Sequence, residues 1–154
     1  MELKNLINRI DLTSKSKLEK YHNQFTHFID LLRTRNLNET TISEINKQID
    51  LLNSLDSKDK SLKSQYRKSQ GNLLRLLTKE HNLVTQNYYR NTWMMIGMGA
   101  IGVPIGTALG VSSKNMGLIG IGLPIGMAIG IAVGVSLDKK AEKSGNQLDI
   151  EIKY

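Results

Sequence analysis

Two long apolar runs, separated by only four residues, constrain this chain more than any other feature of its sequence. They cover residues 93–111 and 116–137, and Lys114 in the link is the only ionisable side chain between residues 93 and 137. As α-helices the runs would be about 28 and about 33 Å long, close to the bilayer hydrocarbon thickness of about 30 Å. Because a backbone in lipid must satisfy its own hydrogen bonds, the pattern predicts two transmembrane helices in an antiparallel hairpin.

The rest of the sequence is polar and divides into two flanking parts. The chain has 154 residues and a net charge of +7, and residues 1–92 carry most of that charge, with 16 Lys and Arg against 10 Asp and Glu. Residues 138–154 are charged but balanced, with 4 against 4. We therefore predict a cytoplasmic helical, coiled-coil-like domain at 1–92, a transmembrane hairpin at 93–137 and a charged C-terminal tail at 138–154.

Apolar residues in the N-terminal part recur at steps of three and four, the period of an amphipathic helix. Three stripes follow this period, over residues 18–32, 42–52 and 62–83. Two pairs, Ser16 with Glu19 and Thr41 with Glu44, have the spacing of helix-starting capping boxes. The stripes predict an all-α domain of at least two antiparallel helices, with the last one able to continue into the apolar part. They fit either a helical core or a coiled-coil surface for self-association.

The residues that flank the apolar runs predict an orientation. Four basic residues lie outside the runs against one in the link, namely Arg90, Lys139, Lys140 and Lys143 against Lys114. The positive-inside rule then places both termini of an integral, two-pass protein in the cytoplasm. Tyr88, Tyr89 and Trp93 have the composition of interface anchors at the same end of the hairpin.

The two apolar runs are internal repeats of each other, twenty residues apart. Residues 101–110 and 121–130 are identical at seven of ten positions. Glycines recur at every fourth position in both, at Gly102, Gly106, Gly110, Gly122, Gly126, Gly130 and Gly134. A helix face without side chains lets two backbones approach closely, so we expect these glycines to set helix packing or oligomerisation.

With this spacing the chain resembles glycine-zipper transmembrane hairpin proteins over about residues 97–134. The resemblance implies association of helices within one chain or between chains. Reflection of the hairpin about Lys114 brings Gly102 opposite Gly126 and Gly106 opposite Gly122. The remaining glycines of the hairpin lie off the strict period, at positions 97, 99, 117 and 120.

Each apolar run also contains one proline. Pro104 and Pro124 have no amide proton, so each frees the carbonyl four residues earlier, at Ala100 and Gly120. We therefore expect a kink near the middle of each helix, either tolerated by the packing or used as a hinge.

The composition argues against enzymatic chemistry. The chain has no cysteine, its serines and histidines lie in no recognisable nucleophile motif, and a formal G-x-G-x-x-G match at residues 97–102 follows no predicted strand. We expect no catalytic residues, no metal and no cofactor. Without an ionisable side chain inside the runs, a proton pathway is also disfavoured. A pore would have to be lined by glycine backbone and a few polar residues, namely Thr107, Ser112, Ser113, Lys114 and Ser136.

These features give one leading hypothesis and two alternatives. The leading one is a non-enzymatic homo-oligomer whose cytoplasmic domain controls assembly of the hairpin, forming a weakly selective pore or permeabilising the membrane. The first alternative is a membrane-anchored adaptor that presents its N-terminal helices and its C-terminal tail to a protein partner. The weaker alternative is a membrane-tethered nucleic-acid sensor that uses a basic stretch containing Lys63, Arg67 and Lys68, although interleaved acids favour an ordinary solvated helix face.

The last residues of the tail have a different pattern. Residues 148–154 alternate apolar and charged side chains, which is the period of a β-strand. This pattern predicts either an edge strand that joins a partner's sheet or a disordered end.

Overall fold

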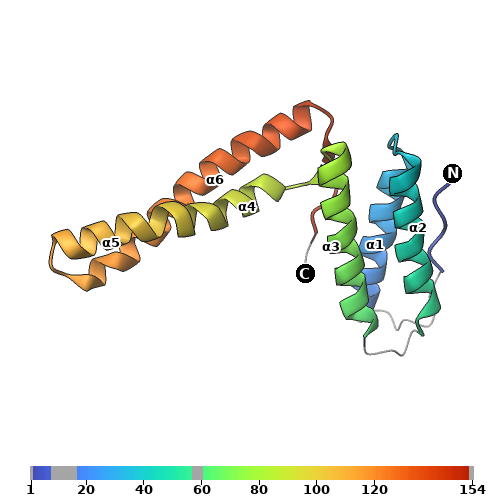
Figure 1. Cartoon of the computed structure of the whole chain (residues 1–154), viewed down its shortest axis with the longest axis horizontal. Coiled ribbons are helices and arrows are strands. Elements are labelled where there is room, and N and C mark those ends of the chain that lie inside the picture. Colours follow the sequence, from blue (N-terminus) through green and yellow to red (C-terminus); the bar gives the residue numbers. More distant parts are fainter. Residues whose placement is uncertain (1, 8–16, 57–60, 153–154) are drawn as a thin grey trace. The chain divides into compact units, whose positions relative to one another are not determined.

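The computed structural model describes residues 2–7, 17–56 and 61–152. Helices make up 77% of the chain, and they are the coiled ribbons of Figure 1. The strands β1 (Val84–Thr85) and β2 (Gln147–Leu148) have two residues each. The all-α class predicted from the sequence is therefore confirmed. Two compact units are present: a bundle unit formed by residues 1–83 with 148–154, and a hairpin unit formed by residues 84–147. These divisions differ from the predicted ones, which fell after residues 92 and 137.

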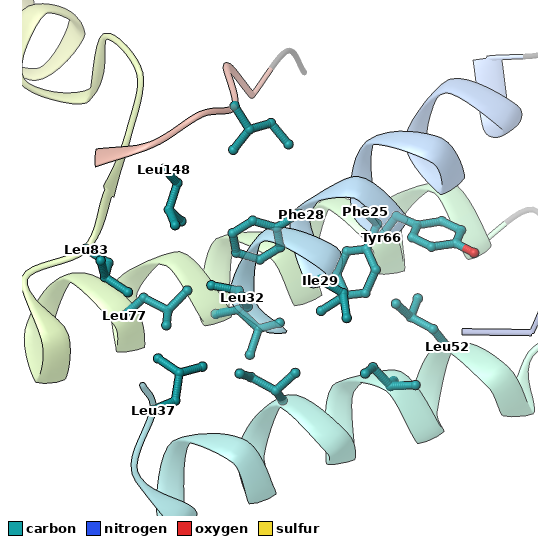
Figure 2. Close-up of a cluster of buried hydrophobic side chains, with 14 of the residues drawn as sticks. Phe25, Phe28, Ile29, Leu32, Leu37, Leu52, Tyr66, Leu77, Leu83 and Leu148 are labelled. Carbon is teal, nitrogen blue, oxygen red and sulfur yellow. The ribbon is translucent and has the colours of Figure 1, made fainter. Parts of the chain in front are cut away.

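Three amphipathic helices form the bundle unit, α1 (Lys17–Arg33), α2 (Glu39–Ser54) and α3 (Leu62–His81). Their apolar stripes face one another around a single core, and Figure 2 shows Phe25, Phe28 and Leu32 of α1 beside Tyr66 and Leu77 of α3. Burial of these side chains is the main stabilising contribution, because each removes a large apolar area from water. The predicted stripes thus correspond to a helical core.

The start of α2 corrects the predicted capping box. The helix begins at Glu39, and the side chain of Asn38 accepts a hydrogen bond from the Thr41 amide at 2.8 Å. Asn38 is therefore the N-cap residue of α2, and Thr41 lies inside the first turn of the helix. Glu44 instead accepts hydrogen bonds from Lys47 and then Gln48, and these lower the pKa of its carboxyl group. The other predicted cap, Ser16, lies outside the described residues.

The end of α3 corrects the expectation that this helix continues into the apolar part. It stops at His81 because Asn82 adopts a left-handed backbone conformation, with φ of 54°. Asparagine tolerates this conformation and ends helices in this way. The Leu83 amide then donates to the Leu77 carbonyl at 3.2 Å, and β1 follows.

The C-terminal segment packs into the bundle unit. After α6 the chain turns at Gly145, where φ is 71°, and β2 pairs with β1 of the same chain. Leu148 is 1% exposed and lies in the bundle core (Figure 2). Ile150 belongs to the same core. Of the residues with the predicted strand period, Leu148 therefore pairs within the chain and Ile150 packs in the same core, while residues 153–154 lie outside the described residues.

The hairpin unit consists of two long helical segments joined at residues 113–115. The first contains α4 (Tyr88–Ile96), the π-helix η1 (Gly97–Gly102) and α5 (Val103–Ser112), and the second contains the 3-10 turn η2 (Met116–Leu118) and α6 (Ile119–Lys143). Tyr88–Ser112 and Met116–Lys143 are long and apolar enough to cross a membrane, by length and composition. Both extend beyond the predicted limits at the base of the hairpin, by five residues before Trp93 and six after Leu137.

Candidate functional site

The two helical segments of the hairpin unit contact each other through faces formed by glycine residues. A Cβ built on any of eight glycines would lie within 3.0 Å of another atom of the same chain, and for all but Gly110 that atom belongs to the backbone. The eight are Gly97, Gly102, Gly106, Gly110, Gly122, Gly126, Gly130 and Gly134. We call this set the glycine interface. Backbones this close gain dispersion contacts that any side chain would prevent.

The pairs expected from reflection about Lys114 lie together. A Cβ on Gly126 would meet the amide nitrogen and Cα of Gly102, and a Cβ on Gly122 would meet the same atoms of Gly106. By contrast, apart from the adjacent backbone of its own helix and its chain neighbours, no atom of the described residues lies within 4 Å of a Cβ built on Gly99 or Gly120. All seven glycines on the four-residue period are therefore packed, and Gly97 is the one member of the glycine interface that lies off it.

Gly97 belongs to the glycine interface although it lies off the four-residue period. It precedes Gly102 by five residues, and η1 is a π-helix in which the Val103 amide donates to the Met98 carbonyl five residues back. A π-helix accommodates one more residue per hydrogen-bonded turn than an α-helix, so a five-residue step keeps both glycines on one face. The five-residue step just ahead of Pro104 is the sequence signal for this register change.

The prolines occupy different settings in the two segments. Pro104 is the second residue of α5, directly after the π-helix, and Pro124 lies inside α6, which continues without a break from Ile119 to Lys143. The first segment therefore contains a π-helix that includes Ala100, and the kinks expected at the two prolines stay a prediction.

A buried carboxylate closes the base of the glycine interface. Asp138 of α6 is 8% exposed and accepts hydrogen bonds from the backbone amides of Tyr89 at 3.0 Å and Arg90 at 2.9 Å. These amides are among the orphan donors at the start of α4, so Asp138 caps a helix 48 residues earlier in the chain. Gly134 makes the approach possible, since its Cβ would collide with the Arg90 backbone.

From the sequence alone, Asp138 is placed in the charged C-terminal tail, without a role in the hairpin. The signal was its position, because Asp138 continues the series Gly122, Gly126, Gly130 and Gly134 by one further step of four. A carboxylate at the next interface position of α6 faces the other segment, where the start of α4 offers free amides.

Large apolar side chains lie on the outside of the hairpin unit. Eleven of them are exposed, namely Met95, Ile96, Val103, Leu109, Val111, Met116, Ile121, Leu123, Ile125, Ile129 and Val133. The buried positions of α5 are Gly106 and Gly110. The unit is thus arranged with backbone inside and apolar side chains outside, the reverse of a domain that folds in water.

The proposed pore-lining residues are spread along the hairpin. Ser112, Ser113 and Lys114 are exposed at the link, whereas Ser136 is exposed about 25 Å further along α6 from its first residue. The Thr107 hydroxyl donates to the Pro104 carbonyl of its own helix at 2.9 Å. The structure therefore brings only the three link residues together.

The other predicted sites lie at the base of the hairpin unit and on α3. Tyr88 and Tyr89 are in the first turn of α4 with an edge-to-face contact at 5.1 Å between ring centroids, and Trp93 is half-buried one turn further on. In the bundle unit, Arg67 and Lys68 are exposed, while the Lys63 ammonium lies 5.3 Å from the centre of the Tyr21 ring. Lys63 is therefore engaged within the bundle.

Comparisons with protein-family models, with curated proteins and with solved structures give no match. Within the described ranges, no group of three or more His, Asp or Glu side chains has the arrangement of a metal site. The geometry of the glycine interface and its apolar surround is therefore the basis for a functional proposal.

Proposed function

We propose that this chain is a non-enzymatic membrane protein whose hairpin unit inserts as a packed pair of helices and anchors the bundle unit at the membrane surface. The observation that carries this proposal is the reversed packing of the hairpin unit, with glycine inside and large apolar side chains outside. In this respect the hairpin resembles a glycine zipper closed within one chain.

The exposed apolar side chains favour lipid over water as the surroundings of the hairpin. Exposed apolar patches of more than a few hundred Å² are uncommon on proteins that are soluble as monomers. Each large side chain left in water forgoes about 1.5 to 3 kcal/mol of burial free energy, whereas lipid tails solvate it at little cost. The length of both helical segments is consistent with a full crossing.

The charges at the two ends of the hairpin support a single orientation. Arg90, Lys139, Lys140 and Lys143 lie at the base, and Lys114 is in the link. The positive-inside rule then favours a cytoplasmic base and a link on the far side of the membrane. The bundle unit, which adjoins the base in the sequence, would be cytoplasmic.

The occupied glycine interface favours the anchor over the pore. Glycine faces that contact their own chain are not available to bring copies together, so a pore would need another surface for assembly. A pore lining would also need polar side chains at successive depths, and away from the link only Thr107 and Ser136 of the proposed lining residues are exposed. We therefore place the adaptor hypothesis, in which the hairpin holds the bundle for a protein partner, ahead of the pore.

A flotation experiment with a matched pair of variants tests the anchor. The intact chain reconstituted with liposomes should float with them and resist alkaline extraction, and the vesicles should retain an encapsulated dye. Ile125→Asp places a charge on the outer face of the hairpin and should prevent flotation, because a carboxylate near the middle of a span costs about 2.5 to 3.5 kcal/mol on insertion scales. Leu51→Asp changes a similarly exposed apolar residue of the bundle and should float normally.

Two outcomes would count against this proposal. If the intact chain did not float with the liposomes although its bundle unit was folded, the membrane anchor would be excluded. Flotation accompanied by dye release would instead favour the pore, and the release should then disappear in the Ile125→Asp variant.

A further inference from the structure

The described N-terminal residues lie along α2 as an extended segment held by two asparagines. The side chain of Asn46 accepts from the Lys4 amide at 2.8 Å and donates to the Glu2 carbonyl at 3.0 Å. Asn53 repeats the arrangement one step along, accepting from the Ile7 amide at 2.9 Å and donating to the Asn5 carbonyl at 3.2 Å. Each asparagine therefore brackets one residue of the segment through its backbone.

The spacing of the two asparagines matches the spacing of an extended chain. Asn46 and Asn53 are seven residues apart, which is about 10.5 Å along a helix. The residues that they bracket, Leu3 and Leu6, are three apart, which is about 10 Å in an extended strand. Both leucines pack against the bundle core. Two turns of α2 thus match three residues of the extended segment in length. The backbone hydrogen bonds and the leucine contacts therefore repeat together along the helix.

Charged contacts add selectivity to this arrangement. The Lys4 ammonium lies 2.6 Å from the Asp50 carboxylate, between the two asparagines on α2. From α1, the Arg33 guanidinium donates to the Lys4 carbonyl at 2.9 Å and to the Asn5 side chain at 2.6 Å. The surface therefore fits an extended peptide with two leucines three residues apart and a basic residue after the first leucine.

The segment is held mainly by polar contacts at the surface. Leu3 and Leu6 are only partly buried, and Ile7 is 54% exposed. Recognition of an extended peptide by main-chain hydrogen bonds with pockets for spaced side chains is also how proteins bind separate peptides. When a segment bound in this way leaves its site, it gives up its surface hydrogen bonds and the contacts of Leu3 and Leu6 with the core.

We propose that the surface formed by Asn46, Asp50 and Asn53 is a peptide-binding site whose occupant can be exchanged for the N-terminal segment of a second copy. Every copy carries an occupant of the required chemistry. Nine residues separate Ile7 from Lys17, and the ten peptide steps between them can extend to about 33 Å, several helix diameters. Exchange of identical segments between protomers is a low-cost route to association, because each copy keeps the contacts that it already makes.

Exchange of the segment does not depend on membrane insertion. It gives copies of the chain a means of association that leaves the glycine interface intact. The test can therefore be run on the full chain in detergent solution, where failure of membrane insertion would not affect the result.

Cross-linking between single-cysteine variants tests the exchange, since the chain itself has no cysteine. Lys4→Cys and Asp50→Cys chains are mixed and treated with a short bis-maleimide. If the segments exchange, the mixture should give a covalent dimer that contains one chain of each variant. Each variant treated by itself should give much less dimer. Adding Asn46→Ala and Asn53→Ala to the Asp50→Cys chain should lower the dimer yield about tenfold through loss of the paired hydrogen bonds. The matched change Asn72→Ala, at an exposed position of α3, should leave the yield unchanged.

The double variant Lys4→Cys with Asp50→Cys provides the internal reference. If it is bridged within one chain while the mixture yields only monomers over a wide concentration range, the segment does not exchange and the proposal is overturned. Failure of the double variant to bridge would overturn the docking itself. An equal dimer yield from Lys4→Cys with Asn72→Cys would also overturn it, by showing that the cross-link reports chance proximity.

Discussion

The bundle unit and the hairpin unit use the same apolar residue types in opposite ways. In the bundle, the buried positions hold large side chains such as Phe25, Phe28 and Leu32, all with no exposed surface. In the hairpin, the buried positions of α6 up to Gly134 are glycines, and residues such as Ile125 and Ile129 point outward. The difference follows from the medium that each unit is suited to. A bundle gains free energy by removing side chains from water, whereas helices in lipid gain it from close contact between backbones.

The helix starts of the two units differ in the same manner. In the bundle, α2 is capped by its neighbour in sequence, Asn38, which accepts from the Thr41 amide. In the hairpin, α4 is capped by Asp138 from the opposite helix. A local cap stabilises one helix by itself, but a cap from across the interface stabilises α4 only while the two segments stay together. Unfolding of α4 and separation of the two segments are therefore more strongly coupled than they would be through the glycine contacts alone.

The first prediction applies one substitution to both units. Leu32→Ala removes a fully buried side chain from the bundle and should lower its free energy of unfolding by about 2 to 5 kcal/mol. Leu109→Ala removes the same atoms from an exposed position in α5, where the side chain is 38% exposed, and should cost the hairpin less than about 1 kcal/mol. Hydrogen exchange resolved by segment measures both. Comparable losses in the two units would show that the hairpin is stabilised by its side chains.

The second prediction reverses the comparison by adding a methyl group. Gly126→Ala should destabilise the hairpin by about 1 to 3 kcal/mol, because the new Cβ would collide with the backbone of Gly97 and Gly102, which cannot move aside. The higher helix propensity of alanine, about 1 kcal/mol, opposes this loss without cancelling it. Trp93 is the only tryptophan of the chain and its carbonyl adjoins Gly130, so its fluorescence during detergent denaturation reports on the interface.

Gly120→Ala is the matched control for this substitution. Gly120 lies in the same helix, and a Cβ built there would have no described atom within 4 Å other than those of its chain neighbours and its own helix backbone. Its substitution should leave the hairpin unchanged or slightly more stable, as expected from helix propensity alone. Equal effects at positions 120 and 126 would contradict the glycine interface.

Much of this architecture could be predicted from the sequence because it is encoded in periodic patterns. The stripe that contains Phe25, Phe28 and Leu32 predicts a buried helix face, and the four-residue steps from Gly122 to Gly134 predict a helix face that can be closely approached. Both patterns depend only on the geometry of a regular helix. For that reason the two patterns predict the buried face of a helix without knowledge of what the helix packs against.

The features that were missed depend on departures from that regular geometry or on contacts between distant residues. Gly97 joins the glycine interface only because η1 is a π-helix, which a search with a strict period of four overlooks. The cap on α4 requires Asp138 and Tyr89 to be neighbours in space, 49 residues apart in sequence. Likewise, the hydrogen bonds of Asn46 to the N-terminal segment link an ordinary helix position to residues with no periodic pattern.

The third and smallest predicted effect concerns the cap between the helices. Asp138→Ala should destabilise the closed hairpin by about 0.5 to 2 kcal/mol, since it leaves the amides of Tyr89 and Arg90 without their acceptor. Asp138→Asn should cost less, because asparagine retains an acceptor oxygen and caps helices nearly as well. Hydrogen exchange at these two amides measures the loss, with Glu142→Gln, at an exposed position of α6, as the control. If Asp138→Ala accelerated exchange at these amides while leaving the rest of the interface protected, Asp138 would act as a local cap, like Asn38 in the bundle. Faster exchange along the whole of α4 is instead the result expected of a cap that holds two helices together.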